Sequence, residues 1–201
     1  MNKTKKIDAR TIALLGIMTG LIILMSVVPF LGYIPLGLMD ATIIHVPVII
    51  VAIVEGPFMG GILGFIFGMT SLIKAYIAPS GALFFAFMNP VISVLPRILI
   101  GVLTGYAYKA LKARNSKVVN KSAIAISAVI GTLTNSIGVL GLTYLIYAKR
   151  VVESMGSGAN STAFKILGGI FLSSSLGEIV GAVLVSVPVC FALLKAFKRG
   201  R

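Results

Sequence analysis

The sequence has 201 residues, of which 58% are hydrophobic and only 11% are charged, and its mean hydropathy is +1.06. Soluble domains are on average about a quarter charged and less than half apolar, so this composition excludes a soluble globular fold, whose surface needs more polar groups. The 18 lysines and arginines outnumber the acids to give a net charge of +13, but they lie between long apolar runs, which favours a membrane protein over a nucleic-acid-binding one.

Six membrane-spanning helices are predicted, which makes residues 1–201 a single all-α integral membrane domain, since a spanning helix needs about 20 residues. The predicted spans, in chain order, are Thr11–Val28, Ala41–Val54, Phe58–Tyr76, Pro90–Leu111, Ser122–Tyr147 and Phe164–Phe197. The first is too long for the apolar core of a signal peptide. The second is short, and is expected to be tilted, partly interfacial or shielded by its neighbours. Pro188 is expected to kink the long sixth span or to mark where it leaves the hydrocarbon.

The basic residues separate into two groups if the chain crosses the membrane six times. Thirteen lie on the side of the termini: in the N-terminal residues 1–10, in the loop after the fourth span and in the tail 195–201. Cytoplasmic loops are enriched in lysine and arginine, so both termini are predicted to be cytoplasmic. The other side holds four, Lys74, Lys149, Arg150 and Lys165, and Arg97 falls inside a span.

Two outer segments are too apolar for ordinary solvated loops. Pro29–Asp40 is almost entirely apolar, and Ala78–Met88 contains three phenylalanines. Such segments either cover a cavity as lids or lie in the headgroup region, where aromatic residues are common. A third outer segment, Arg150–Thr162, is rich in Gly, Ser and Asn and is predicted to be mobile.

Small residues occur in two sets, and small residues let helices approach closely in lipid. Gly16 and Gly20 lie on the first predicted span, with Ala9 and Ala13 on nearly the same stripe. Either packing within the chain or contact with a partner would use this stripe. The second set is expected to pack the second and third spans within the chain, and consists of Gly56, Gly60, Gly61, Gly64 and Gly68.

Arg97 is the clearest charged residue at membrane depth, where charges usually face a cavity or a partner. It lies seven residues into the fourth span, roughly 10 Å below the outer end. Asn89 and Pro90 supply a helix N-cap and first position, and Pro96 removes a backbone donor from the turn that carries Arg97. The guanidinium is suited to clamp a carboxylate or phosphate. The alternatives are an ion pair with Glu178 or an orientation toward the membrane surface.

The sixth predicted span carries Ser174, Ser175 and Glu178 close together on one helix face. Glu178 either accepts a hydrogen bond from a ligand or neutralises Arg97. Asn135, in the middle of the fifth span, suits an amide-bearing ligand or makes an interhelical hydrogen bond. His45 is expected to be a packed, hydrogen-bonded residue or else a site residue, and Lys74 lies at the outer rim.

Catalytic and nucleotide-binding motifs are not found in the sequence. It contains no phosphate-binding loop and no dinucleotide fingerprint. The one histidine and the one cysteine, Cys190, are far apart, so no nucleophile set, disulfide or cysteine-based metal cluster is predicted. The chain is therefore expected to bind a ligand without being an enzyme and without a cofactor or metal.

Three segments resemble the substrate-binding S component of energy-coupling factor (ECF) vitamin transporters, and the resemblance covers nearly the whole chain. They are T-I-I-H-V-P-V-I-I (42–50), E-G-P-F-M-G-G-I-L-G-F-I-F-G (55–68) and N-P-V-I-S-V-L-P-R-I-L-I-G (89–101). The resemblance implies a prokaryotic plasma-membrane protein that binds a vitamin from outside, beneath the outer loops. It then topples onto a shared transmembrane subunit driven by two ATPases, so ATP hydrolysis belongs to the partners. The family's first-helix alanine motif contacts that subunit, and Gly16 and Gly20 occupy this pattern here.

The segments around His45 and Arg97 look most like those of pantothenate-type members. The polar residues at membrane depth, which are Arg97, Asn135 and Glu178 with the nearby serines, suit a small anion that carries amide and hydroxyl groups. A binder of riboflavin or thiamine would be expected to stack aromatic residues on its ligand, and tryptophan is absent. An alternative is an S component for another small vitamin, such as riboflavin, a pyridoxine-type vitamin or folate. A second alternative is a stand-alone secondary transporter. The substrate-binding candidates are Arg97, Asn135, Glu178, Asn89, Ser174, Ser175, His45 and Lys74, and the docking candidates are Ala9, Ala13, Gly16 and Gly20.

Overall fold

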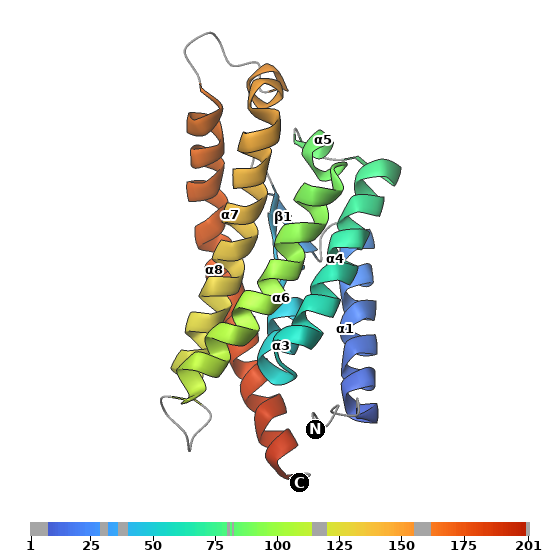
Figure 1. Ribbon diagram of the computed structural model, residues 1–201, viewed down its shortest axis with the longest axis vertical. Helices are drawn as coiled ribbons and strands as arrows, with labels where there is room; N and C mark the ends of the chain where they lie inside the picture. Colours follow the sequence, from blue (N-terminus) through green and yellow to red (C-terminus); the bar gives the residue numbers. More distant parts are fainter. Residues whose placement is uncertain are drawn as a thin grey trace, which may run out of the picture.

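The computed structural model describes residues 8–28, 32–35, 40–79, 81, 83–113, 120–154 and 162–199. Long helices run side by side along the molecule, and α1 begins at the same end at which α8 finishes (Figure 1). The elements are α1 (Ala9–Val27), β1 (Tyr33–Pro35), β2 (Asp40–Thr42), α3 (Val46–Val54), α4 (Pro57–Ile77), α5 (Phe84–Phe87), α6 (Pro90–Ala113), α7 (Lys121–Ser154) and α8 (Ala163–Arg199). The predicted mobile segment at 150–162 lies largely outside the described residues.

Five of these helices, α1, α4, α6, α7 and α8, are long and apolar enough to cross a membrane. Their ends agree with the predicted spans to within two residues, except that α7 continues to Ser154. The α7 backbone is non-helical at Tyr147, where the predicted span ends. Pro188 lies inside α8, which continues past it to Arg199. These five helices are consistent with the predicted all-α membrane protein, from which the short strands β1 and β2 depart.

The second predicted span is replaced by a strand and a short helix. Strand β2 pairs antiparallel with β1, with Tyr33 opposite Thr42, and α3 has only nine residues. Nine helical residues extend about 14 Å, roughly half of the hydrocarbon thickness. Non-helical backbone at this depth is tolerated only where protein covers it. Such cover is present at Ile44 and His45, which are buried just before α3, and every residue of α3 from Val46 to Ile53 is buried as well.

Glycines of the second set bring α4 into close contact mainly with α6, the fourth predicted span, whereas the sequence predicted a contact between the second and third spans. A Cβ atom on Gly64 would overlap the backbone of Arg97, and one on Gly60 would meet Ala52 and the backbone of Gly101. Gly68 lies equally close to the α6 backbone at Ser93 and Val94. Because α4 approaches so closely, the turn of α6 that carries Arg97 is held against it.

We expect Gly64→Ala to lower the melting temperature of the detergent-purified protein. The added methyl group meets backbone atoms, which cannot rotate away, so the two helices must separate at a cost of about 1–3 kcal/mol. Gly141→Ala is the matched control, because a Cβ atom at Gly141 has nothing within 4 Å. Equal melting temperatures for the two variants would show that the α4–α6 contact adapts without cost.

The phenylalanine-rich outer segment packs onto the bundle. Leu83, Phe85 and Ala86 are buried, and they form a second apolar cluster with residues of α6, α7 and α8. The short helix α5 therefore covers one end of the bundle (Figure 1).

Candidate functional site

Glu178 links three parts of the fold through its carboxylate. The side chain is only 6% exposed. Its Oε1 accepts a hydrogen bond from the backbone N–H of Thr42 at 2.9 Å, and its Oε2 accepts one from the Ser136 hydroxyl at 3.1 Å. Glu178 thus holds strand β2 against α7 and α8, a role that the sequence did not reveal.

His45 is completely buried at the start of α3. Its Nε2 lies 3.0 Å from the hydroxyl oxygen of Thr132 on α7. Thr132 is one helical turn from Ser136, so the contacts made by His45 and Glu178 lie next to each other on α7. The expectation that His45 is a packed, hydrogen-bonded residue is thus met.

Arg97 lies in the interior beneath α5. It is 5% exposed, and its Nη1 donates a hydrogen bond to the backbone oxygen of Ile92 at 2.7 Å. The guanidinium carbon is 5.4 Å from the ring centre of Phe67 and 5.3 Å from that of Phe87. The guanidinium is therefore directed toward the start of α6 and is covered by protein.

Asn135 and Ser175 each carry a buried oxygen atom that the protein leaves without a hydrogen bond. Asn135 is 6% exposed and Ser175 is 3% exposed, and neither Oδ1 nor Oγ has a partner in the described part of the chain. An unsatisfied buried polar atom costs about 1–3 kcal/mol, so such atoms are natural contacts for a ligand. The alternative of an interhelical hydrogen bond to Asn135 Oδ1 is not observed among the described residues. The neighbouring Ser174 hydroxyl is occupied, because it donates to the backbone oxygen of Ile170 at 2.9 Å.

The remaining candidates, Asn89 and Lys74, lie at helix ends. Asn89 caps α6 as predicted, since its Oδ1 accepts a hydrogen bond from the N–H of Val91 at 2.9 Å. Its Nδ2 lies 3.4 Å from the hydroxyl of Tyr147, at the α7 kink. Lys74 is half-buried in the last turn of α4. The buried polar residues described above form the interior polar cluster, which we define as His45, Arg97, Thr132, Asn135, Ser136, Ser175 and Glu178.

Sequence reasoning missed several participants in this region. Thr132 and Ser136 are four residues apart and so lie on one face of α7, and this spacing was the available signal. Thr42 takes part through its backbone, which no sequence pattern reports. The rings of Phe67 and Phe87 come from different elements, and only the packing of α4 and α5 against α6 brings them to Arg97.

The stripe of small residues on α1 faces away from the rest of the chain. Ala9, Ala13, Gly16 and Gly20 are all exposed. A Cβ atom built on Gly16 or Gly20 would meet nothing within 4 Å. Packing within the described part of the chain is thus excluded as the reason for these two glycines, which leaves the face open to lipid or to a partner.

Comparisons with known proteins agree with this architecture. The family described as "ECF transporter, substrate-specific component" matches residues 10–190. A protein of Lactococcus lactis subsp. cremoris named pantothenic acid transporter PanT is 30% identical over 168 residues, which are 77% of this chain and 78% of the relative. The pantothenate transporter PanT of Leuconostoc mesenteroides subsp. mesenteroides is 28% identical over 189 residues, 92% of this chain and 90% of the relative. With a family match across most of its length, the chain belongs to the substrate-specific components of ECF transporters.

Proposed function

We propose that the chain is the pantothenate-binding S component of an ECF-type importer in the plasma membrane. The observation that carries the proposal is the interior polar cluster, which combines one cation with acceptors that lack a partner inside an otherwise apolar bundle. The names of the two relatives point to the same vitamin.

The chemistry of pantothenate matches this cluster group by group. Its carboxylate pairs with Arg97, because a guanidinium binds a carboxylate through two parallel hydrogen bonds. Its amide N–H donates to Asn135 Oδ1, and a hydroxyl group bonds to Ser175 Oγ. Glu178 already accepts two hydrogen bonds from the protein, so we assign it mainly to holding β2 in place. Asn89, Ser174, His45 and Lys74 remain secondary candidates.

The proposal is tested by calorimetric titration of the detergent-purified protein with pantothenate, riboflavin, pyridoxine and folate. Only pantothenate should produce saturable heat, and it should raise the melting temperature in proportion to its occupancy. Binding of another vitamin with no response to pantothenate would reject the substrate. Failure of every vitamin to bind, with uptake retained by the protein alone, would favour a secondary transporter.

A substitution of Asn135 distinguishes ligand recognition from helix packing. We expect Asn135→Leu to weaken pantothenate binding about 5- to 150-fold, because the ligand amide would lose its acceptor at a cost of about 1–3 kcal/mol. Stability should be retained or increased, since the variant removes an unsatisfied buried oxygen. Calorimetric titration and thermal melting measure the two quantities, and a large loss of stability at unchanged affinity would contradict the assignment.

Uptake requires partners in this proposal. The open stripe of Ala9, Ala13, Gly16 and Gly20 on α1 supports docking onto the transmembrane coupling subunit, whose two ATPases drive transport. Gentle purification from native membranes should recover these three subunits together with the chain.

The proposed topology has six crossings and both termini in the cytoplasm, with the β1–β2 hairpin and α3 forming the second crossing. The excess of basic residues near the termini supports this orientation. With Cys190 first replaced by alanine, a cysteine at Ser122 should resist an impermeant thiol reagent in intact cells. A cysteine at Ser154 should react, since both positions are exposed at opposite ends of α7. The reverse labelling pattern would invert the topology.

A further inference from the structure

Cationic side chains stand over aromatic rings at the end of the bundle where α1 begins and α8 finishes. The guanidinium of Arg10 lies 3.0 Å from the ring centre of Phe197, which joins the start of α1 to the end of α8. The ammonium of Lys121, at the start of α7, lies 5.0 Å from the ring centre of Phe191 on α8. At the end of α6 the pairs are Lys109 with Tyr106 at 5.8 Å and Lys112 with Tyr108 at 6.0 Å. We call these four pairs the basic-aromatic end.

The positive charge at this end is not balanced within the described part of the chain. Asp8 and Glu55 are the acids nearest in sequence to these helix ends, and Glu55 Oε2 accepts a hydrogen bond from the Thr11 hydroxyl at 2.9 Å. The described residues contain no ion pair for Lys109, Lys112 or Lys121. All three lysines are exposed, so their charges remain available to an external anion.

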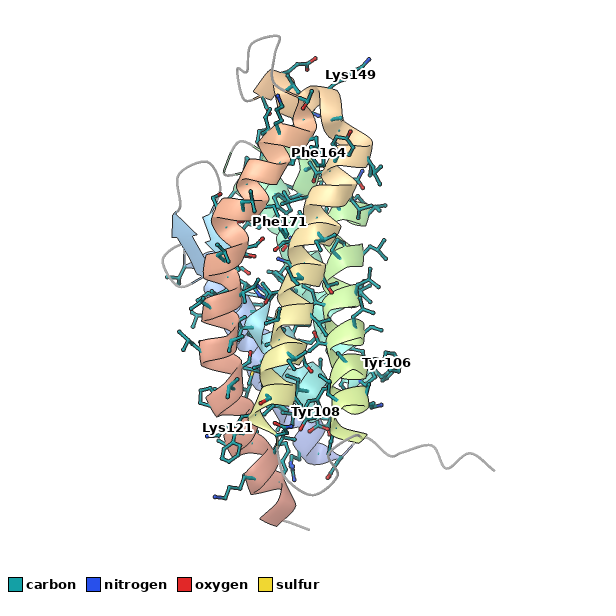
Figure 2. All side chains as sticks on the ribbon, turned by 90° about the vertical axis from the view of Figure 1, so that its left-hand side faces the viewer. Tyr106, Tyr108, Lys121, Lys149, Phe164 and Phe171 are labelled. Carbon is teal, nitrogen blue, oxygen red and sulfur yellow. The ribbon has the colours of Figure 1, made fainter. Side chains whose placement is uncertain are left out.

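The pairs are spread around the perimeter of the bundle. Figure 2 shows Tyr106 and Lys121 at opposite edges of this end, with Lys149 at the far end of the molecule. Lipid headgroups surround a membrane protein on all sides, whereas one docked partner covers only one side. Aromatic rings are enriched at headgroup depth, and a ring beneath a cation helps to hold the charge in place.

We propose that the basic-aromatic end binds the phosphate groups of anionic phospholipids. Each lysine near an anionic membrane surface strengthens binding by roughly fivefold. The phosphate accepts hydrogen bonds from the ammonium groups, and the rings keep these groups at headgroup level. Anionic lipid retained at this end would anchor the protein by one end and set its depth in the bilayer.

Native mass spectrometry of the full-length protein tests the proposal, with phosphatidylglycerol and phosphatidylcholine supplied in equal amounts. The wild type should retain phosphatidylglycerol preferentially. The double variant Lys112→Gln with Lys121→Gln should lose about tenfold or more of that preference. The matched control is Lys149→Gln with Lys165→Gln, which removes the same charge from the opposite end and should behave like wild type. Phe191→Leu keeps all charges and should reduce the preference about two- to fivefold.

Three outcomes would overturn the proposal. Equal loss of preference in the test and control variants would mean that net charge alone attracts the lipid. Displacement of phosphatidylglycerol by millimolar inorganic phosphate would indicate a site for free anions. If the test variant still prefers phosphatidylglycerol but no longer purifies with the coupling subunit, this end is a protein-docking surface. None of these readouts depends on pantothenate binding, so the two proposals fail separately.

Discussion

Replacing Arg97 by glutamine should weaken pantothenate binding about 30- to 4,000-fold. The guanidinium is buried beneath Phe87, and the loss of one partner from a desolvated, charged hydrogen-bonded pair costs about 2–5 kcal/mol. Arg97→Lys should restore only part of the affinity, because an ammonium group cannot reproduce the planar two-point contact with a carboxylate. Calorimetric titration of the purified wild type and both variants measures the effect.

The same variants show whether Arg97 binds the ligand or only stabilises the fold. Thermal melting without ligand should change far less than the affinity if the ligand carboxylate is the main partner. Lys149→Gln is the control for loss of one positive charge, and it should bind pantothenate like wild type. If Arg97→Gln loses as much stability as it loses affinity for pantothenate, Arg97 has a structural role and the carboxylate assignment is wrong. The same conclusion follows if Arg97→Gln binds pantothenate like wild type.

Bulky residues on the open face of α1 should strongly reduce uptake while sparing vitamin binding. Gly16→Leu and Gly20→Leu place large side chains where a Cβ atom has no neighbour within 4 Å, so the isolated protein should fold and bind pantothenate normally. A close helix contact with the coupling subunit would be blocked. Overpacking of such a contact costs about 1–3 kcal/mol, and uptake should fall about tenfold or more.

Gly141→Leu is the matched control for this experiment. It adds the same side chain to another open helix position, on α7, and should leave both binding and uptake intact. Uptake of labelled pantothenate into cells carrying the whole transporter is measured beside calorimetry on the purified chain. Joint loss of binding and uptake in the α1 variants would mean that these glycines serve the fold of the S component. Normal uptake would exclude this face from docking.

The sequence by itself determined the class of protein and most of the helices. Long runs of apolar residues cannot be buried in a soluble domain of this size, and α1, α4, α6, α7 and α8 follow directly from them. Local chemistry also located helix ends, as at Asn89, whose side chain caps α6. Small residues predicted that the third span makes a close helix contact, but the predicted partner was the second span, whereas α4 packs mainly against α6.

The second predicted span and the candidate site required the tertiary structure. Hydropathy alone could not separate a helix that crosses lipid from α3, a shorter one that neighbouring helices bury completely. Composition likewise identified Arg97, Asn135 and Glu178 as polar groups at membrane depth, but not their partners. Glu178 binds the backbone of Thr42, 136 residues away, and Arg97 lies beneath rings from α4 and α5. Contacts between distant segments depend on how the helices pack, and that packing decides which buried oxygen atoms, such as Asn135 Oδ1, are left for a ligand.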